Sequence, residues 1–177
     1  MKHLNIEIKA KCNNHKKIRD FLRSHKAEFR GTDHQIDTYF KVNDGRLKLR
    51  EGNIENHLIY YKRSNKKGPK QSDIILLDST PGSPLKEILT RSCGILAVVD
   101  KKREIYFIEN VKFHIDTVKK LGTFVEIEAI ADVDGRGENV DVKRKKLLAQ
   151  CEGYLRLFKI QPKDMISVSY SDMLLGK

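Results

Sequence analysis

Cysteine, tryptophan and long apolar runs are all scarce in this 177-residue sequence. The three cysteines, Cys12, Cys93 and Cys151, are odd in number and widely scattered, unlike the cysteines of a disulfide scaffold or a zinc site. No apolar run approaches membrane-spanning length, and Glu7 with alternating charge lies where a secretory signal would need unbroken apolar residues. We therefore expect a reducing, cytoplasmic setting and no membrane association.

The absence of tryptophan and the small number of other aromatic residues remove the stacking groups that single-stranded nucleic-acid binders use. Basic residues nevertheless give the chain a formal net charge of +11 at pH 7. Such a charge indicates an anionic partner, which is nucleic acid, an acidic membrane surface or a phosphorylated small molecule. Charge alone does not choose among these three.

Alternation of apolar and polar residues predicts strands along most of the chain. In the first, residues 4–11, Leu4, Ile6 and Ile8 lie on one face while Glu7 and Lys9 lie on the other. Further strands are predicted at 35–42, 46–51, 58–63, 74–77, 95–99, 103–108, 111–116 and 123–131. Polar loops are predicted at 64–70 and 134–139.

Three helices interrupt these strands. The first is capped by Asn13 or Asn14, includes Phe29 on its apolar face and stops at Gly31. The second is capped by Ser83 and ends at Gly94, and the third covers residues 140–158. Many strands with short turns and few helices favour a single α+β domain, residues 1–177, in which an antiparallel sheet curls or closes.

Charges of one sign gather on particular strands of this sheet. Lys48 and Arg50 share a face of one strand, whereas Glu126 and Glu128 share a face of another. A solvated outer face explains any single case, but exteriors usually mix the two signs within each strand. If the sheet closes, these faces converge on a polar lumen, which is tolerable only when matching ions fill it. A triphosphate with divalent cations is such a filling.

Several segments carry a resemblance to a known family. The opening N-I-E-I-K resembles the Glu-x-Glu-x-Lys signature of the CYTH superfamily, the triphosphate tunnel enzymes that include class IV adenylyl cyclases and thiamine triphosphatases. Similar segments follow in family order: Q-I-D-T-Y-F, G-R-L-K-L-R-E, L-I-Y-Y-K-R, K-K-R, V-K-F-H-I-D and L-G-T-F-V-E-I-E. The set spans nearly the whole chain and is most similar to the class IV cyclase branch. It implies a closed or nearly closed eight-stranded antiparallel barrel with flanking helices around a charged tunnel.

The resemblance also implies site residues at the matching positions. Ligands of Mg²⁺ or Mn²⁺ would be Glu7, Asp116, Glu126 and Glu128. Substrate phosphates would contact Lys9, Lys48, Arg50, Lys62, Lys101 and Arg103, with His114 as a further substrate contact or a hydrogen-bonded bystander. Catalysis would depend on Glu7, Lys9 and Lys62, with either Lys62 or a metal-bound hydroxide as the base. One position departs from the signature, because Asn5 replaces its first glutamate. An amide offers an oxygen ligand but no negative charge. The number of bound metal ions, one or two, therefore stays open.

The resemblance therefore implies a metal-dependent enzyme of class IV adenylyl cyclase type, which converts ATP to cyclic AMP and pyrophosphate. The alternative is a triphosphatase that hydrolyses thiamine triphosphate, inorganic triphosphate or nucleoside triphosphates. A third reading is a non-catalytic binder of polyphosphate or RNA, although carboxylates in the proposed groove would repel a phosphate backbone unless a cation intervenes. The cyclase branch also suggests a homodimer.

Overall fold

The computed structural model describes residues 2–63, 70–133 and 139–176. The two predicted polar loops therefore lie largely outside the described residues, at 64–69 and 134–138. The strands are β1 Lys2–Lys11, β2 Glu28–Phe40, β3 Arg46–Glu51, β4 His57–Arg63, β5 Lys70–Asp78, β6 Ile95–Ile108, β7 Val111–Val118 and β8 Gly122–Val133. The helices are α1 His15–Ser24, α2 Leu85–Cys93, α3 Val140–Leu157, the short 3-10 helix η1 Pro162–Asp164 and α4 Tyr170–Leu174.

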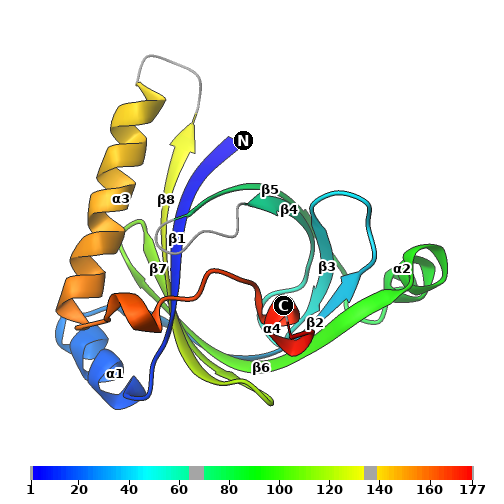
Figure 1. Cartoon of the computed structure of the whole chain (residues 1–177), viewed down its shortest axis with the longest axis horizontal. Coiled ribbons are helices and arrows are strands. Elements are labelled where there is room, and N and C mark those ends of the chain that lie inside the picture. Colours follow the sequence, from blue (N-terminus) through cyan, green and yellow to red (C-terminus); the bar gives the residue numbers. More distant parts are fainter. Residues whose placement is uncertain (1, 64–69, 134–138, 177) are drawn as a thin grey trace.

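The eight described strands form a closed antiparallel barrel in the order β1-β5-β4-β3-β2-β6-β7-β8. Figure 1 shows this ring of strands with α1 and α3 on one side and α2 on the opposite side. The join between β1 and β8 is long, running from Lys2 opposite Val133 to Lys11 opposite Phe124. The join between β1 and β5 is short, with Ile6 opposite Gln71 and Glu7 opposite Lys70. The predicted α+β barrel is confirmed.

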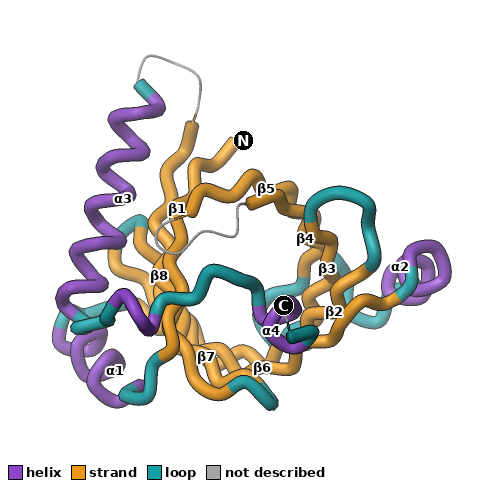
Figure 2. Tube along the Cα trace, in the orientation of Figure 1, coloured by secondary structure: helices purple, strands orange, loops and turns teal. Residues whose placement is uncertain are grey.

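The main apolar core lies outside the barrel rather than within it. Apolar faces of β1, β7 and β8 turn outward, where α1 and α3 cover them (Figure 2). Buried members of this core include Ile8, Phe113, Ile127, Ile18, Leu22, Cys151 and Leu155. Because successive strand residues point to opposite faces, this packing leaves the inner faces of the same strands to their polar residues.

The C-terminal segment crosses one mouth of the barrel and ends in α4 (Figure 1). The backbone N–H of Ile166 donates to the carbonyl oxygen of Lys9 over 2.8 Å, which ties the segment to β1. Ser169 and Asp172 form a reciprocal capping box at the start of α4. Tyr170 is buried in a second apolar cluster with Phe124. The C-terminal segment therefore ends in a short helix whose first residue, Tyr170, lines the cavity.

Helix α1 starts as predicted and ends earlier than predicted. The side chain of Asn14 accepts a hydrogen bond from the backbone N–H of Lys17 over 3.1 Å, so Asn14 is the cap. Lys26 then adopts a left-handed conformation, with φ of 53°, and the chain turns into β2. The prediction that Phe29 belongs to this helix is wrong, because Phe29 lies in β2 opposite Tyr106.

Two smaller expectations also change. The predicted strands 95–99 and 103–108 are one continuous strand, β6. Helix α2 has Pro84 at its N-cap and no side-chain capping bond, so the prediction that Ser83 caps it is wrong. Within the described residues, no helix has both the length and the apolar character needed to cross a membrane.

Candidate functional site

The inner faces of the strands enclose a cavity of about 200 Å³. Charged side chains of both signs line it, and they come from β1, β2, β3, β6, β7, β8 and the β3–β4 connection. The structure brings together nine of the predicted site residues: Glu7, Lys9, Lys48, Arg50, Lys101, Arg103, His114, Glu126 and Glu128. Their proposed roles remain predictions.

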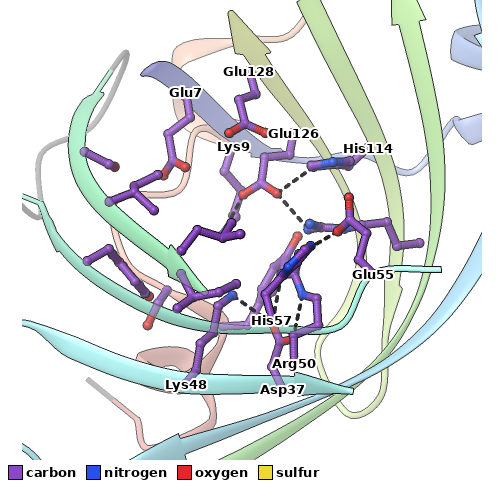
Figure 3. Close-up of a pocket in the computed structure, with 18 of the residues that line it drawn as sticks. Glu7, Lys9, Asp37, Lys48, Arg50, Glu55, His57, His114, Glu126 and Glu128 are labelled. Atoms are coloured by element: carbon purple, nitrogen blue, oxygen red, sulfur yellow. Dashed lines mark hydrogen bonds and ion pairs between the residues drawn. The ribbon is translucent and has the colours of Figure 1, made fainter. Parts of the chain in front are cut away.

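Carboxylates from β1 and β8 form one wall of the cavity. Glu7 lies directly opposite Glu128 in the strand register, and Lys9 lies opposite Glu126. Figure 3 shows Glu7, Glu126 and Glu128 on one side of the cavity, with Lys48, Arg50 and Asp37 on the other. Like charges in directly opposed positions destabilise a sheet. The pair Glu7 and Glu128 therefore concentrates negative charge on this wall.

Glu126 is already neutralised by its neighbours. Its carboxylate lies 3.2 Å from Lys9 Nζ, 2.7 Å from Arg103 and 3.1 Å from Nδ1 of His114. Burial alone would raise the pKa of Glu126, but Lys9 and Arg103 outweigh burial and hold that pKa well below its ordinary value. Burial and the nearby Arg103 lower the pKa of His114. Glu126 is consequently anionic at neutral pH and His114 is uncharged.

Asp37 on β2 organises the opposite, basic wall. Its carboxylate accepts hydrogen bonds from Lys48 at 2.8 Å, from Lys101 at 2.7 Å and from Arg50 at 2.9 and 3.2 Å. Burial would raise the pKa of Asp37, but these three cations hold it well below the ordinary value. Burial beside Arg50 and Arg103 conversely lowers the pKa of Lys101. One carboxylate thus holds three phosphate-binding candidates in place before any ligand arrives.

Asp116 is a correction to the predicted metal ligands. It is fully buried and does not line the cavity. Its oxygens accept hydrogen bonds from Arg103 at 2.8 and 2.6 Å and from the hydroxyl of Tyr170 at 2.8 Å. Because both oxygens are committed to these partners, Asp116 positions Arg103 and Tyr170 instead of facing a cation.

Lys62 is a second correction. Alternation along β4 turns His57, Ile59 and Tyr61 into the cavity, so Lys62 lies on the outer face. Its side chain is 53% exposed and forms an ion pair with Asp44. Because two tyrosines are adjacent in L-I-Y-Y-K-R, the sequence does not indicate which residues of this strand face inward. A shift of one residue in register moves every side chain of the strand to the opposite face. The structure therefore gives no support to Lys62 as a tunnel lysine or base.

The cavity residues that were not assigned roles in the sequence include Asp37, Glu55, His57, Lys112 and Tyr170. Lys112 could have been found, because it shares the strand face of His114. Tyr170 places its ring 3.9 Å from Lys9 Nζ and 5.0 Å from the ring of Phe124, and it closes one mouth. Glu55 belongs to the connection between β3 and β4, where no strand periodicity predicts which way a side chain points.

The cavity fits a hard divalent cation in its donor chemistry. Within the described ranges, no three His, Cys, Asp or Glu residues are already gathered as a metal-binding group. However, Asn5 donates from its amide to Glu128, and its buried Oδ1 has no hydrogen-bond partner in the described part of the chain. Buried polar atoms without partners are rare and call for an explanation. Oxygen atoms of Glu7, Glu128 and Asn5 are the kind that Mg²⁺ and Mn²⁺ prefer.

A family model describes this architecture. The CYTH domain model matches residues 3–156. The chain belongs to the CYTH domain family. The matched range includes β1 from its second residue, strands β2 to β8 and the predicted site residues.

Solved structures resemble the CYTH barrel over almost its whole length. A protein from Pyrococcus horikoshii OT3 has 22% identity and a TM-score of 0.76, covering 95% of this chain and 98% of its own. A candidate adenylate cyclase from Vibrio parahaemolyticus has 16% identity and a TM-score of 0.70, with coverage of 97% and 98%. A candidate adenylyl cyclase from Hippeastrum with a dominant triphosphatase activity has 15% identity and a TM-score of 0.61, with coverage of 99% and 94%. At these identities the likeness shows the fold, and the chain has no significant match among curated proteins.

Proposed function

We propose that this CYTH protein is a divalent-metal-dependent enzyme that binds an organic triphosphate in the barrel and converts ATP to cyclic AMP and pyrophosphate. The observation that carries the proposal is the presence of a carboxylate wall and a basic wall in one cavity. A basic wall alone would suit any polyanion. The carboxylates add repulsion toward phosphate unless a cation lies between them, which favours a metal–triphosphate ligand over a bare polyanion.

The basic wall would bind and orient the phosphates. Asp37 holds Lys48, Arg50 and Lys101 within 2.7 to 3.2 Å, so these donors are ordered before the ligand enters. Arg103 is held by Asp116 and Glu126, and its planar group is suited to forked contacts with phosphate oxygens. Such preorganised donors stabilise charge that develops on phosphate oxygens during reaction.

Glu7 and Glu128 would hold the cation, with Asn5 Oδ1 as a nearby neutral donor. A bound Mg²⁺ or Mn²⁺ would supply Lewis acidity and would neutralise phosphate charge. Lys9 would stay with Glu126 on the boundary between the two walls, since its ammonium also lies over the ring of Tyr170. The ligand would therefore meet fixed positive charge on one side and carboxylate oxygens on the other.

Triphosphate hydrolysis is the second candidate, and the Hippeastrum structure with its dominant triphosphatase activity favours it. The same walls serve both reactions. Attack by a ribose 3'-hydroxyl on the α-phosphorus releases pyrophosphate, whereas attack by water on the terminal phosphorus releases orthophosphate.

Product analysis separates the two reactions. Purified protein is incubated with ATP, thiamine triphosphate or inorganic triphosphate and with Mg²⁺ or Mn²⁺, and the products are resolved by chromatography. Cyclic AMP with equimolar pyrophosphate supports the cyclase, and orthophosphate supports the triphosphatase. Formation of neither across all three substrates would contradict both, and binding that survives chelation but falls steeply with salt would instead favour a polyanion binder.

A further inference from the structure

The cavity already contains an anion bound by two of its cations, and that anion belongs to the protein. Glu55 lies 2.8 Å from Nη1 of Arg50 and 2.5 Å from Nζ of Lys112. The side-chain amide of Gln35 adds a third contact at 3.1 Å. Figure 3 shows the Glu55 carboxylate turned into the cavity near His114. Two cations and an amide around one carboxylate resemble the donor set that binds a phosphate group.

The β3–β4 connection that carries Glu55 is built to hold it there. Buried Asp33 accepts backbone hydrogen bonds from Asn53, Ile54 and Glu55, at distances of 2.6, 2.9 and 3.0 Å. At Gly52, a Cβ would come within 2.7 Å of the Asp33 carboxylate, so a residue without a side chain is required for this approach. Asp33 and Gly52 therefore hold the backbone of this connection in place.

The position of Glu55 places it at the end of the cavity opposite Tyr170. Lys112 lies opposite Glu128 in the β7–β8 register, and Glu128 lies opposite Glu7. These residues mark the end from which β1 starts, whereas Tyr170 lies beside Phe124 and Asp116 toward the other end. Arg50 also contacts Asp37, so the pair Arg50 and Lys112 adjoins the basic wall at the end of the cavity away from the C-terminal segment.

We propose that Arg50 and Lys112 form a further phosphate subsite, which Glu55 fills in the free protein, so that Glu55 limits the length of the phosphate chain. This inference rests on the proposed binding of triphosphate in the same cavity. Glu55 is a specificity-determining residue in this scheme, because a ligand with a fourth phosphate must displace its carboxylate. Burial would raise the pKa of Glu55, but Lys112 and Arg50 hold that pKa far below its ordinary value, so the displaced group is anionic.

The substitution Glu55→Gln tests the subsite, because it removes the charge and keeps the shape. Binding of inorganic triphosphate and tetraphosphate is measured by calorimetry with Mg²⁺ present, and the ratio of the two affinities is the readout. We expect a ratio within about threefold of unity in the wild type. In Glu55→Gln we expect tetraphosphate to bind at least about tenfold more tightly than triphosphate.

Three further variants exclude a general field effect. Glu128→Gln removes the same charge from the same cavity and, because Glu128 would hold the cation, should weaken both ligands without changing their ratio. Adding Lys112→Met to Glu55→Gln should abolish the gain for tetraphosphate, while Glu51→Gln, whose partner is Lys86 outside the cavity, should resemble the wild type. Unfolding curves confirm that each variant is folded.

An unchanged ratio in Glu55→Gln, or an equal change in Glu128→Gln, would overturn the subsite. If the wild type binds neither polyphosphate, the proposed function fails on its own. In that case a gain of tetraphosphate binding in Glu55→Gln would still support the subsite, and no gain would overturn it as well.

Discussion

The side of the barrel that α1 and α3 cover differs sharply from the side formed by β4 and β5. On the covered side, Ile8 and Ile127 are buried beneath helices while Glu7 and Glu128 face the cavity. On the other side, Ile75 and Leu77 are 68% and 59% exposed on the outer face. The inner face of that side is mixed, since Ile59, Ile74 and Leu76 line the cavity beside His57, Tyr61 and Ser72.

The helix-covered side and the β4–β5 side of the barrel therefore have different roles in supporting the cavity. A carboxylate wall that holds like charges in opposed positions needs a rigid support, and burial of its outer face under helices supplies it. Among the described lining residues of β4 and β5 there is no Asp, Glu, Lys or Arg, so this wall has no carboxylate to restrain and offers a phosphate only the neutral donors of Tyr61 and Ser72 and the imidazole of His57. Phosphates are therefore expected to bind away from β4 and β5, between the carboxylate wall and the cluster around Asp37.

The largest expected effect concerns the carboxylate wall. Glu7→Gln should lower kcat/KM by about a thousandfold with a triphosphate substrate, because the charge that attracts the cation is halved. Its melting temperature should be unchanged or higher, since the repulsion with Glu128 is relieved. Steady-state kinetics and thermal unfolding measure the two effects. Glu87→Gln on the exposed face of α2 is the control, and a loss of stability with full activity would contradict this assignment.

The next effect concerns the support of the basic wall. Asp37→Asn should reduce the free energy of unfolding at pH 7 by about 3–5 kcal/mol, because Lys48, Arg50 and Lys101 lose their shared partner. The folded-state pKa of Asp37 lies well below 3.8, so its contribution is complete above about pH 4 and is lost as pH falls through the folded pKa. The difference in free energy of unfolding between variant and wild type should therefore become smaller below pH 4. Urea unfolding between pH 3 and pH 7 measures it, and a gap that widens on acidification would refute this account.

A third test compares the two outer faces directly. Ile127→Ala should cost about 2–5 kcal/mol, because Ile127 is buried in the core beneath α1 and α3. Ile75→Ala on β5 should cost less than about 0.5 kcal/mol, because that side chain is largely exposed. Urea unfolding of both variants gives the difference. Equal costs would mean that another surface covers β5 in solution.

The smallest expected effect concerns a lysine on the outer face. Lys62→Ala should change kcat/KM by less than about twofold, because Lys62 faces Asp44 outside the cavity and exposed ion pairs contribute little. Lys48→Ala, inside the cavity, should raise KM by about tenfold or more through loss of a charged contact. Steady-state kinetics of the Lys62→Ala and Lys48→Ala variants show which of the two lysines contacts the substrate. A larger loss in Lys62→Ala than in Lys48→Ala would restore the original prediction.

Much of the barrel could be predicted because its signal is local. In β1, β7 and β8 the alternation of apolar and charged residues is regular, so the inward positions of Glu7, His114 and Glu126 follow from it. In β4 the apolar, aromatic and basic residues do not alternate cleanly; the resemblance implied a cavity role for Lys62, and the structure places that residue on the outer face. Glu55 had no such signal, because its direction depends on backbone contacts with Asp33, which is distant in sequence.

The sequence by itself determined the strand pattern, the family resemblance and the residue types that oppose each other across the lumen, because side-chain alternation is a property of the extended backbone. Only the tertiary structure decided which charges satisfy one another. The commitment of Asp116 to Arg103, the cluster on Asp37 and the insertion of Glu55 between Arg50 and Lys112 depend on closure of the barrel. Closure brings distant strands within hydrogen-bond distance, and in a buried site an ionised group must find such partners or pay a large desolvation cost.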